Sequence, residues 1–176
     1  MARFTGGFLF LMLFSASCRA QEQRLSLRDA HLSIPIRREI VSIVAKRLLS
    51  EDHHPTPEAD ILDFFVEFPH LAQDGSKTIF VAEYGSPNPD IWLFKVSGAH
   101  VIPILADGGQ GHGMWGKGFH HGMRDYQTTW ITNMETGATK VLRFDGTRYR
   151  PAYCSVYFVD EDGKLKNGPR GKCNKD

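Results

Sequence analysis

Several features are scarce or missing in this sequence of 176 residues, and each absence narrows the class of protein. No charge of one sign dominates, because 21 Lys and Arg residues face 20 Asp and Glu residues, for a net charge of +1. A dedicated nucleic-acid-binding protein carries a basic stripe, so this balance argues against that class. With 41% hydrophobic and 23% charged residues the composition is globular, which excludes disorder, collagen and coiled coil for the whole chain.

Long hydrophobic runs are also lacking. The longest, residues 6–14, falls well short of the roughly 20 apolar residues that a membrane-spanning helix needs. It follows Arg3 and precedes several small residues, which is typical of a secretory signal peptide. We therefore expect residues 1–20 to be a signal peptide, cleaved after Ala20 or Ser17. The mature chain would be periplasmic or secreted, with no transmembrane span after cleavage.

Cysteine is scarce, with three residues in the chain. Cys18 follows small residues in an order that resembles a bacterial lipoprotein box, so lipid anchoring at Cys18 is an alternative to a soluble mature protein. Cys154 and Cys173 are an even pair, and an oxidising compartment favours a disulfide between them. Such a bridge would hold the basic C-terminal tail against the domain. Two free thiols, one of them nucleophilic, are the alternative, although no histidine lies near Cys154 in the sequence.

Recognised catalytic motifs are missing as well. The sequence has no Gly-x-Ser-x-Gly elbow, no His-Glu-x-x-His helix and no phosphate-binding loop that ends in Gly-Lys-Ser/Thr. Residues 111–116 fit Gly-x-Gly-x-x-Gly, but no clear helix follows, so a dinucleotide site is not expected. We expect no cofactor, and at this point it stays open whether the protein is an enzyme.

One amphipathic helix is predicted in the region 21–57, between a polar lead-in and a proline-containing linker. Ser33 can cap this helix and Pro35 suits its first turn. An apolar stripe follows at helical spacing: Ile36, Ile40, Ile43, Val44 and Leu48. We expect the stripe to pack on a sheet, with docking to a partner protein as the alternative.

The pattern becomes that of a β domain in residues 58–176, which we expect to form a single unit. Alternating or β-rich segments predict strands over residues 61–68, 78–84, 91–96, 100–105, 126–132, 139–144 and 149–159. Turn signals at Ser97-Gly98 and Asp145-Gly146 join two of these pairs as hairpins. The fold expected is mainly β (α+β): an antiparallel sheet of about seven strands with the N-terminal helix packed on it.

The predicted strands contain an internal echo, by which we mean short segments that recur at a nearly constant offset along the sequence. Residues 95–98, with Pro103, match residues 143–146, with Pro151, at an offset of 48. Residues 75–78 match residues 122–125 at an offset of 47. We interpret the sheet as two related hairpin units, with a chance match as the alternative.

The turn at residues 144–149, Phe-Asp-Gly-Thr-Arg-Tyr, resembles repeats of the FG-GAP type, which line propellers in cell-surface and exported proteins. The layout is also similar to uncharacterised exported bacterial proteins with an Asp-Gly turn, an aromatic hairpin and a closing cysteine. The resemblance covers about residues 61–154 and implies an exported β protein. FG-GAP repeats usually carry an acidic calcium loop. Residues 72–76 and 120–125 hold one acidic residue each, too few for the oxygen ligands that calcium requires, so calcium binding is not carried over.

The glycine-rich stretch of residues 108–122 is the most informative segment for function. Seven of its fifteen residues are glycine, and we expect a long loop that can bring backbone N–H groups close to a ligand. Its candidate ligand-binding residues combine aromatic, polar and cationic groups: His112, Trp115, Lys117, Phe119 and His120. The alternative is a plain connection between the two units, with its aromatic residues anchored in the core.

Three functions are compatible with these observations. The first is a non-enzymatic binding or interaction module of the cell envelope, whose partner is a protein or a glycan and not a nucleic acid. The second is a small metal-dependent or hydrolytic enzyme that uses the segment 107–125, with four reacting groups: His112, His120, His121 and Asp125. No recognised metal-ligand spacing is present, so no metal site is assigned. The third is a purely structural envelope protein.

Overall fold

The computed structural model describes residues 25–52, 55–83, 85–86, 88–107, 113–131, 136–162 and 164–173. The predicted signal peptide at residues 1–20, including Cys18, lies outside these residues, as does the candidate His112. Among the described residues, no helix is both long enough and apolar enough to cross a membrane.

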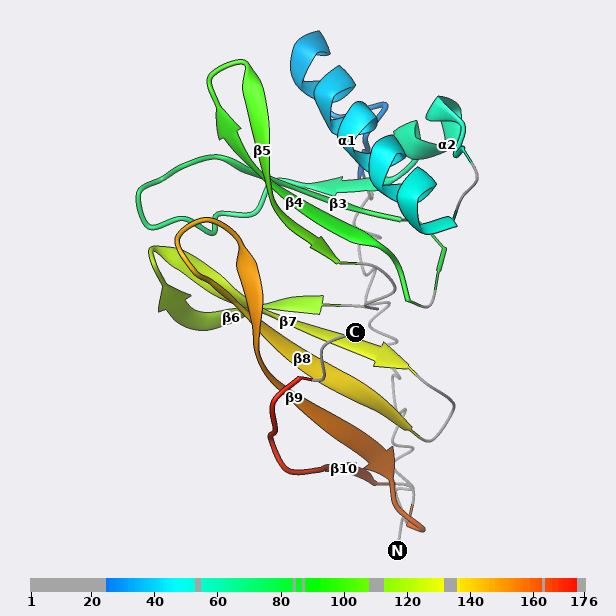
Figure 1. The fold of residues 1–176 in the computed structure, drawn as a ribbon, viewed down its shortest axis with the longest axis vertical. Helices are drawn as coiled ribbons and strands as arrows, with labels where there is room; N and C mark the ends of the chain where they lie inside the picture. Colours follow the sequence, from blue (N-terminus) through cyan, green and yellow to red (C-terminus); the bar gives the residue numbers. More distant parts are fainter. Residues whose placement is uncertain are drawn as a thin grey trace, which may run out of the picture.

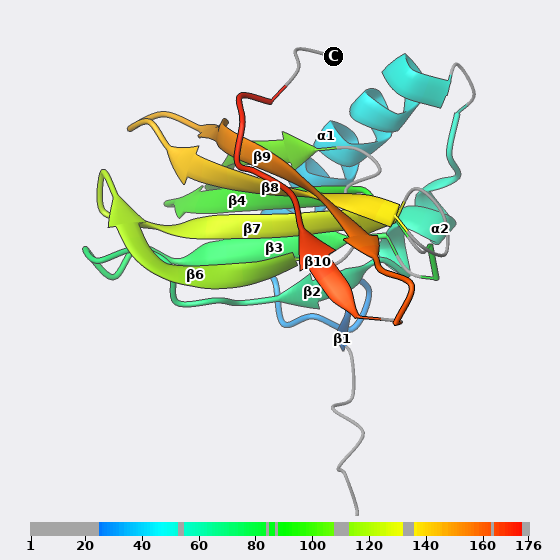
Figure 2. The same cartoon turned by 90° about the horizontal axis from the view of Figure 1, so that it is seen from below.

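The described chain forms three layers, which are a layer of helices and two five-stranded antiparallel sheets (Figure 1). The first sheet has the order β1 (Leu25–Ser26), β2 (Phe65–Glu67), β3 (Thr78–Ala82), β4 (Ile91–Ser97) and β5 (His100–Asp107). The second sheet has the order β10 (Leu165–Asn167), β9 (Tyr149–Val159), β8 (Thr136–Phe144), β7 (Met123–Ile131) and β6 (Gly113–His120). The helices α1 (Ile34–Asp52) and α2 (Glu58–Leu62) cover the outer face of the first sheet. Figure 2 shows the strands of the two sheets running in similar directions.

The fold is mainly β, as predicted, but the single sheet of about seven strands is wrong. The chain leaves the first sheet at the end of β5 and starts a second sheet with β6, which pairs only with β7 in the described residues. All five residues of β3 are buried, because the first sheet is covered by helices on one face and by the second sheet on the other. Hydrophobic periodicity locates strands, but it does not say which strands share a sheet.

Helix α1 packs on the first sheet through the stripe that the sequence predicts. Ile40, Val44 and Leu48 are buried, while Ile36 and Ile43 are partly buried against the same core. The sheet side of this core comes from β3, β4 and β5: Ile79, Val81, Trp92, Phe94 and Val101. Full burial of one such aliphatic side chain is worth roughly 1.5–3 kcal/mol, so this layer is a main source of stability.

The alternation over residues 61–68 predicts one strand, whereas the structure divides this segment. Its first part belongs to α2, which follows Pro57, and only Phe65–Glu67 form β2. Glu58 and Asp60 lie in the first turn of α2, where negative charge favours a helix. Buried Ile61 holds this short helix in the core, which is a tertiary contact that alternation does not reveal.

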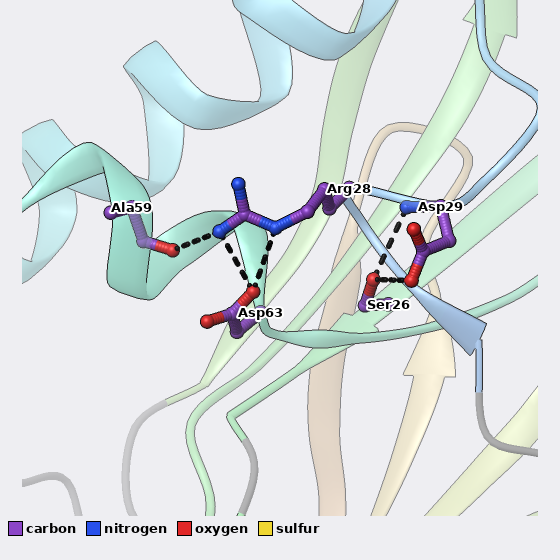
Figure 3. Close-up of polar contacts among 5 residues, drawn as sticks. All are labelled: Ser26, Arg28, Asp29, Ala59 and Asp63. Atoms are coloured by element: carbon purple, nitrogen blue, oxygen red, sulfur yellow. Dashed lines mark hydrogen bonds and ion pairs between the residues drawn. The ribbon is translucent and has the colours of Figure 1, made fainter.

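An arginine connects the N-terminal segment to α2. The Arg28 side chain donates two hydrogen bonds to Oδ1 of Asp63, at 3.0 and 2.9 Å, and one to the Ala59 carbonyl at 3.1 Å (Figure 3). Next to it, the Ser26 hydroxyl donates to Asp29 at 2.7 Å. At least half of each side chain of the ion pair is exposed, so the pair contributes about 1 kcal/mol or less. We interpret this cluster as a structural attachment of β1.

A second core lies between the two sheets. The first sheet contributes Phe80, Ala82, Ile91, Leu93, Ile104 and Leu105, and the second contributes Met123, Tyr126, Leu142, Phe144 and Tyr149. The Tyr149 hydroxyl donates a hydrogen bond to the Arg124 carbonyl at 2.6 Å. Burial and, to a smaller extent, the negative charge of Asp125 raise the pKa of Tyr149, so its phenol remains a donor.

The strands β2–β5 (the first unit) and β6–β9 (the second unit) have equivalent pairing. The two predicted hairpin units correspond to β3–β5 and β7–β9 within them. Residues that pair across neighbouring strands of the first unit recur as pairs 47 or 48 residues later in the second unit. Val66–Val81 recurs as Gly113–Thr128, Ile79–Phe94 as Tyr126–Leu142, and Ile91–Asp107 as Thr139–Ser155. The two units therefore share the strand register of these pairs.

The same irregularity also recurs in both units. The β4–β5 register shifts between Leu93 and Phe94, where Phe94 pairs with Pro103. The β8–β9 register shifts at the equivalent point, where Leu142 pairs with Pro151. Glycines with positive φ occupy equivalent turns: Gly75 and Gly122, Gly98 and Gly146. A shared bulge is a specific feature of a strand pair, so the sequence echo reflects a common architecture.

The two units are stacked in the same orientation. The face of the first unit that contacts the helices is equivalent to the face of the second unit that contacts the first. The matched residues are Ile79 and Tyr126, Phe94 and Leu142, Val101 and Tyr149. On the opposite faces, Phe80, Ala82 and Ile91 of the first unit correspond to Gln127, Thr129 and Thr139. The last layer of a stack needs such a polar outer face.

Candidate functional site

The glycine-rich segment forms an edge strand, which corrects the predicted loop. Residues 113–120 are β6, while residues 108–112 lie outside the described chain. A Cβ atom on Gly113 would overlap the ring of Tyr126, so glycine lets this aromatic side chain cross over the strand. Composition alone predicts a loop, because it does not show that a neighbouring strand supplies the missing side chain.

The two aromatic candidates of β6 have different environments. Trp115 is partly buried, with its ring centroid 4.4 Å from that of Tyr126 and 5.8 Å from that of Phe80. Phe119 is 37% exposed, and the guanidinium of Arg124 lies 5.0 Å from its ring centroid. Trp115 therefore stabilises the contact between the two sheets, and Phe119 is the aromatic residue that solvent reaches.

A bulge in β6 makes space for a carboxylate. Pairing with β7 shifts between Trp115 and Phe119, which leaves residues 116–118 opposite Asp125. A Cβ atom on Gly118 would lie 3.0 Å from an oxygen of Asp125, and one on Gly116 would lie 3.2 Å from its Cβ. Small residues at these two positions therefore let the Asp125 side chain fit beneath the edge strand. Lys117, between the two glycines, is exposed.

Asp125 is hydrogen-bonded to a histidine and forms an ion pair with an arginine. Its Oδ1 lies 2.6 Å from Nδ1 of His120, and its Oδ2 lies 3.5 Å from Nε of Arg143. In the neutral tautomer that donates its Nδ1 proton to this carboxylate, the Nε2 atom of His120 is an acceptor, which is suitable for a base or a metal ligand. Hydrolysis through a covalent intermediate also needs a side-chain nucleophile beside such a dyad. Within the described chain, no serine, threonine or cysteine is hydrogen-bonded to His120.

A metal site is not assembled in the described part of the chain. No group of three or more His, Cys, Asp and Glu residues there could hold a metal ion. His121 lies in the turn after β6 with φ 48°, and His112 is outside the described residues. Of the four groups considered for an enzyme, the described residues bring together His120 and Asp125.

A cavity of about 330 Å³ lies at the other end of the second sheet. It opens on the face that is directed toward the first sheet, between the ends of β7–β9 and the C-terminal tail. Its lining comes from three strands and the tail: Trp130, Ala138, Lys140, Cys154, Ser155, Val156, Pro169, Gly171, Lys172 and Cys173. The volume is at the lower end of the range for small-molecule sites, about 300–1,000 Å³.

The C-terminal tail forms a wall of this cavity because it pairs with β9. Beyond β10, the Gly168 N–H donates to the Val156 carbonyl at 2.7 Å, and Gly171 and Cys154 exchange hydrogen bonds of 2.8 and 3.0 Å. The predicted disulfide joins Cys154 to Cys173. The disulfide thus holds the tail against the sheet at the cavity itself.

The cavity contains a buried cation. Lys140 is 8% exposed, and its Nζ atom lies 5.5 Å from the ring centroid of Trp130, within the range of a cation–π interaction. Lys172, from the tail, is exposed and adds a second ammonium group to the lining. The described lining residues include no Asp or Glu. Trp130, Val156 and Pro169 add apolar surface to the described lining.

Neither Trp130 nor Lys140 was among the candidates from the sequence. The signal that could have found Lys140 is the internal echo, since an offset of 48 aligns Lys140 with Trp92. Trp92 is 1% exposed and stacks on Phe64 in the first core. A charged residue at a position that the equivalent unit fills with a core tryptophan is a local conflict, and such conflicts concentrate at functional sites.

Comparison with known proteins found no match to a family model, to a curated protein or to a solved structure. The function is therefore argued from the geometry of the two candidate regions, the Asp125 cluster (His120, Asp125 and Arg143) and the Lys140 cavity.

Proposed function

We propose that the protein is an exported, non-catalytic binding module whose ligand site is the Lys140 cavity. The observation that carries this proposal is a buried lysine beside a tryptophan in an open cavity, one wall of which is a disulfide-bonded tail. Apolar walls with a few convergent polar groups are the general composition of small-molecule sites. The cavity volume suits a small molecule or one end group of a larger protein or glycan partner.

Export is part of the proposal and has its own support. The N-terminal segment has the composition of a signal peptide, and the disulfide is compatible with an oxidising compartment. The mass of the protein purified from its native compartment tests this part. A mature chain that begins at Gln21 or Cys18 supports export, an added lipid mass on Cys18 supports anchoring, and an intact N-terminus with reduced cysteines contradicts export. The resemblance to FG-GAP-type repeats stays a prediction.

The binding proposal is tested by filling the cavity. Ala138 lines the cavity, whereas its neighbour Thr139 lies on the opposite face of β8. Titration calorimetry would compare wild type, Ala138→Phe and Thr139→Phe against benzoate, phenylacetate, octanoate and the primary amide of each. We expect at least one compound to bind wild type and Thr139→Phe with the same affinity. Ala138→Phe should bind it at least about tenfold more weakly, because the ring occupies part of the ligand volume.

Two results would contradict this assignment. One is the absence of binding by all six compounds to the wild-type protein. The other is equal binding by wild type and a folded Ala138→Phe variant, which would move the ligand site elsewhere.

A second candidate is the small hydrolytic enzyme, which the hydrogen bond between His120 and Asp125 favours. Hydrolysis of p-nitrophenyl acetate provides a general assay. Under this hypothesis His120→Ala abolishes turnover, while the matched variant His121→Ala, in the adjacent turn, retains it. Equal rates for wild type and both variants would leave the Asp125 cluster with a structural role.

A further inference from the structure

We infer that the outer face of the second sheet binds an acidic glycan chain. This is the face of β7, β8 and β9 that is turned away from the first sheet, and Figure 2 shows it in front, with the first sheet behind it. The Lys140 cavity opens on the opposite face of the same strands. The inference therefore goes beyond the proposed function and does not depend on it.

The first argument is that this face is polar at its centre. Gln127, Thr129 and Thr139 are half-buried there, and the hydroxyl oxygens of the two threonines lie 3.4 Å apart. Val141, which pairs with Gln127, is 6% exposed, and Met114, 64% exposed, adds apolar surface at the β6 edge. A protein partner generally needs an apolar centre to its interface. Hydroxyl and amide groups instead suit a partner that is rich in hydroxyls, as a glycan is.

The second argument is the position of Tyr157. This residue pairs with Gly137 of β8, and a Cβ atom on the glycine would overlap the phenol of the tyrosine. The side chain of Tyr157 therefore lies along the sheet instead of pointing away from it, and it remains partly exposed. Such a ring offers an apolar surface with a polar tip, which suits the C–H groups and the hydroxyls of a sugar ring.

The third argument is the charge that this face presents to solvent. The side chains of Arg143 and Arg150, which pair across β8 and β9, are 44% and 54% exposed. The carboxylate next to Arg143 belongs to Asp125, whose side chain is 14% exposed. The carboxylate next to Arg150 belongs to Asp145, which also accepts hydrogen bonds from backbone N–H groups of its own turn. The exposed charge is therefore mainly positive and is complementary to an acidic partner.

A third arginine reaches this face from the C-terminal tail. Arg170 is exposed, and its guanidinium carbon lies 4.8 Å from the ring centroid of Tyr153, while that of Arg143 lies 5.9 Å from the same centroid. Tyr153 and Tyr157 are four residues apart on β9, so their backbone positions are separated by about 13 Å on one face. A guanidinium group binds a carboxylate through two parallel hydrogen bonds. An aromatic contact at Tyr157 and charged contacts near Tyr153 thus fit an acidic oligosaccharide better than a single sugar.

The test compares acidic oligosaccharides with their methyl esters, because esterification removes the charge and keeps the sugar chain. Titration calorimetry at neutral pH would use hexagalacturonate and hexamannuronate against the fully methyl-esterified form of each. We expect wild type to bind at least one acidic hexamer. Its ester should bind at least about tenfold more weakly, as the loss of a charge-assisted hydrogen bond implies.

Two pairs of variants assign the binding to this face. Tyr157→Ala should weaken binding of the acidic hexamer at least about tenfold, whereas Phe158→Ala, at the next position of β9 and on the opposite face, should leave it unchanged. Arg170→Gln should lower the preference for acid over ester. Lys172→Gln, which changes an exposed lysine of the same tail that lines the cavity, should keep that preference. Ala138→Phe, which fills the cavity, should bind the hexamer like wild type.

Four results would overturn the inference. They are no binding of either acidic hexamer by wild type, equal affinity for acid and ester, losses in Phe158→Ala and Lys172→Gln as large as those in Tyr157→Ala and Arg170→Gln, and binding of hexaglutamate as tight as that of the hexamer. The last result would favour an acidic protein as the partner. If Tyr157→Ala does not fold, the comparison of acid and ester on wild type and Arg170→Gln still decides the question. Failure of the cavity to bind small molecules would leave these outcomes unchanged.

Discussion

The first and second units have one backbone pattern but bury different chemistry. In the first unit both faces are apolar, because helices cover one and the second unit covers the other. In the second unit one face is apolar and the outer face carries Gln127, Thr129 and Thr139. The two backbones are equivalent but have different neighbours, so a comparison of the two units separates side chains that packing explains from those that it does not. Lys140 belongs to the second kind.

The two units also differ in charge. Residues 65–107 contain two lysines and five acidic residues, a net charge of −3. Residues 113–159 contain six Lys and Arg and three acidic residues, a net charge of +3. The near-neutral total therefore conceals a separation of charge between the layers. The field of such a charge separation acts over a range set by the ionic strength, about 8–10 Å at 0.10–0.15 M salt.

The sharpest test of the comparison changes the same position in both units. Trp92→Ala should lower the free energy of unfolding by about 3–5 kcal/mol, because it leaves a large cavity against Phe64. Lys140→Met should cost less than Trp92→Ala, because methionine keeps much of the apolar length of the lysine side chain and leaves no large cavity. A loss for Lys140→Met as large as that for Trp92→Ala would mean that the lysine is a structural part of the core.

The disulfide belongs to the second unit, and its removal should have the next largest effect. The double variant Cys154→Ser, Cys173→Ser opens a loop with a sequence separation of 19, and we expect a loss of about 3 kcal/mol by the chain-entropy estimate. Ligand binding should weaken as well, because the tail is a wall of the cavity. Urea unfolding of oxidised and reduced wild type provides the control. Unchanged binding in the double variant would show that the strands alone form the site.

A smaller effect is expected at Tyr149, whose equivalent in the first unit is Val101. Tyr149→Phe removes the hydrogen bond to the Arg124 carbonyl and leaves a buried acceptor, at a cost of about 1 kcal/mol. Tyr153→Phe, on a partly exposed side chain of the same strand, is the matched control and should cost less. Equal values from urea unfolding would argue that the Tyr149 hydroxyl contributes nothing specific.

The smallest effect on stability is expected at low pH, in the turn between β8 and β9. Asp145 accepts hydrogen bonds from the backbone N–H groups of Arg148 and Thr147 and from Arg150, which together lower its pKa from 3.8 to about 2. Because the folded pKa is depressed, the stabilisation is complete above about pH 5 and is lost as the pH falls toward 2.

Unfolding of wild type and Asp145→Asn across this range gives the measurement. The stability difference should be largest above about pH 5 and should shrink below about pH 4. The equivalent turn of the first unit has Ser97, so Ser97→Ala should show no such acid dependence. A constant difference between wild type and Asp145→Asn at all pH values would contradict the assignment.

Several elements were predictable because their signals are local. The stripe Ile40, Val44 and Leu48 predicts a buried helix face, and the turn glycines Gly98 and Gly146 predict both hairpins. The pair Cys154–Cys173 was predictable once Cys18 is assigned to the signal peptide, because two cysteines then remain for an oxidising compartment.

Other features depend on contacts that the local pattern does not contain. Ile61 reads as part of an alternating strand, and only its place beneath α1 makes a short helix there. The glycines of β6 suggest a loop until Tyr126 is seen to cover one of them. The environments of the candidates Trp115 and His120 also depend on such contacts. Trp115 packs at the interface between the two sheets, whereas His120 is hydrogen-bonded to Asp125.

The sequence by itself determined the helix, most of the strands, the repeat at 47 or 48 residues and the disulfide, because spacing and residue type act over short distances along the chain. The tertiary structure decided that the repeats form two stacked sheets and that Lys140 is buried beside Trp130 at the bonded tail. These outcomes depend on which apolar faces meet. Which apolar faces meet is set by all the long-range contacts of the fold together, and no short segment of the sequence contains those contacts.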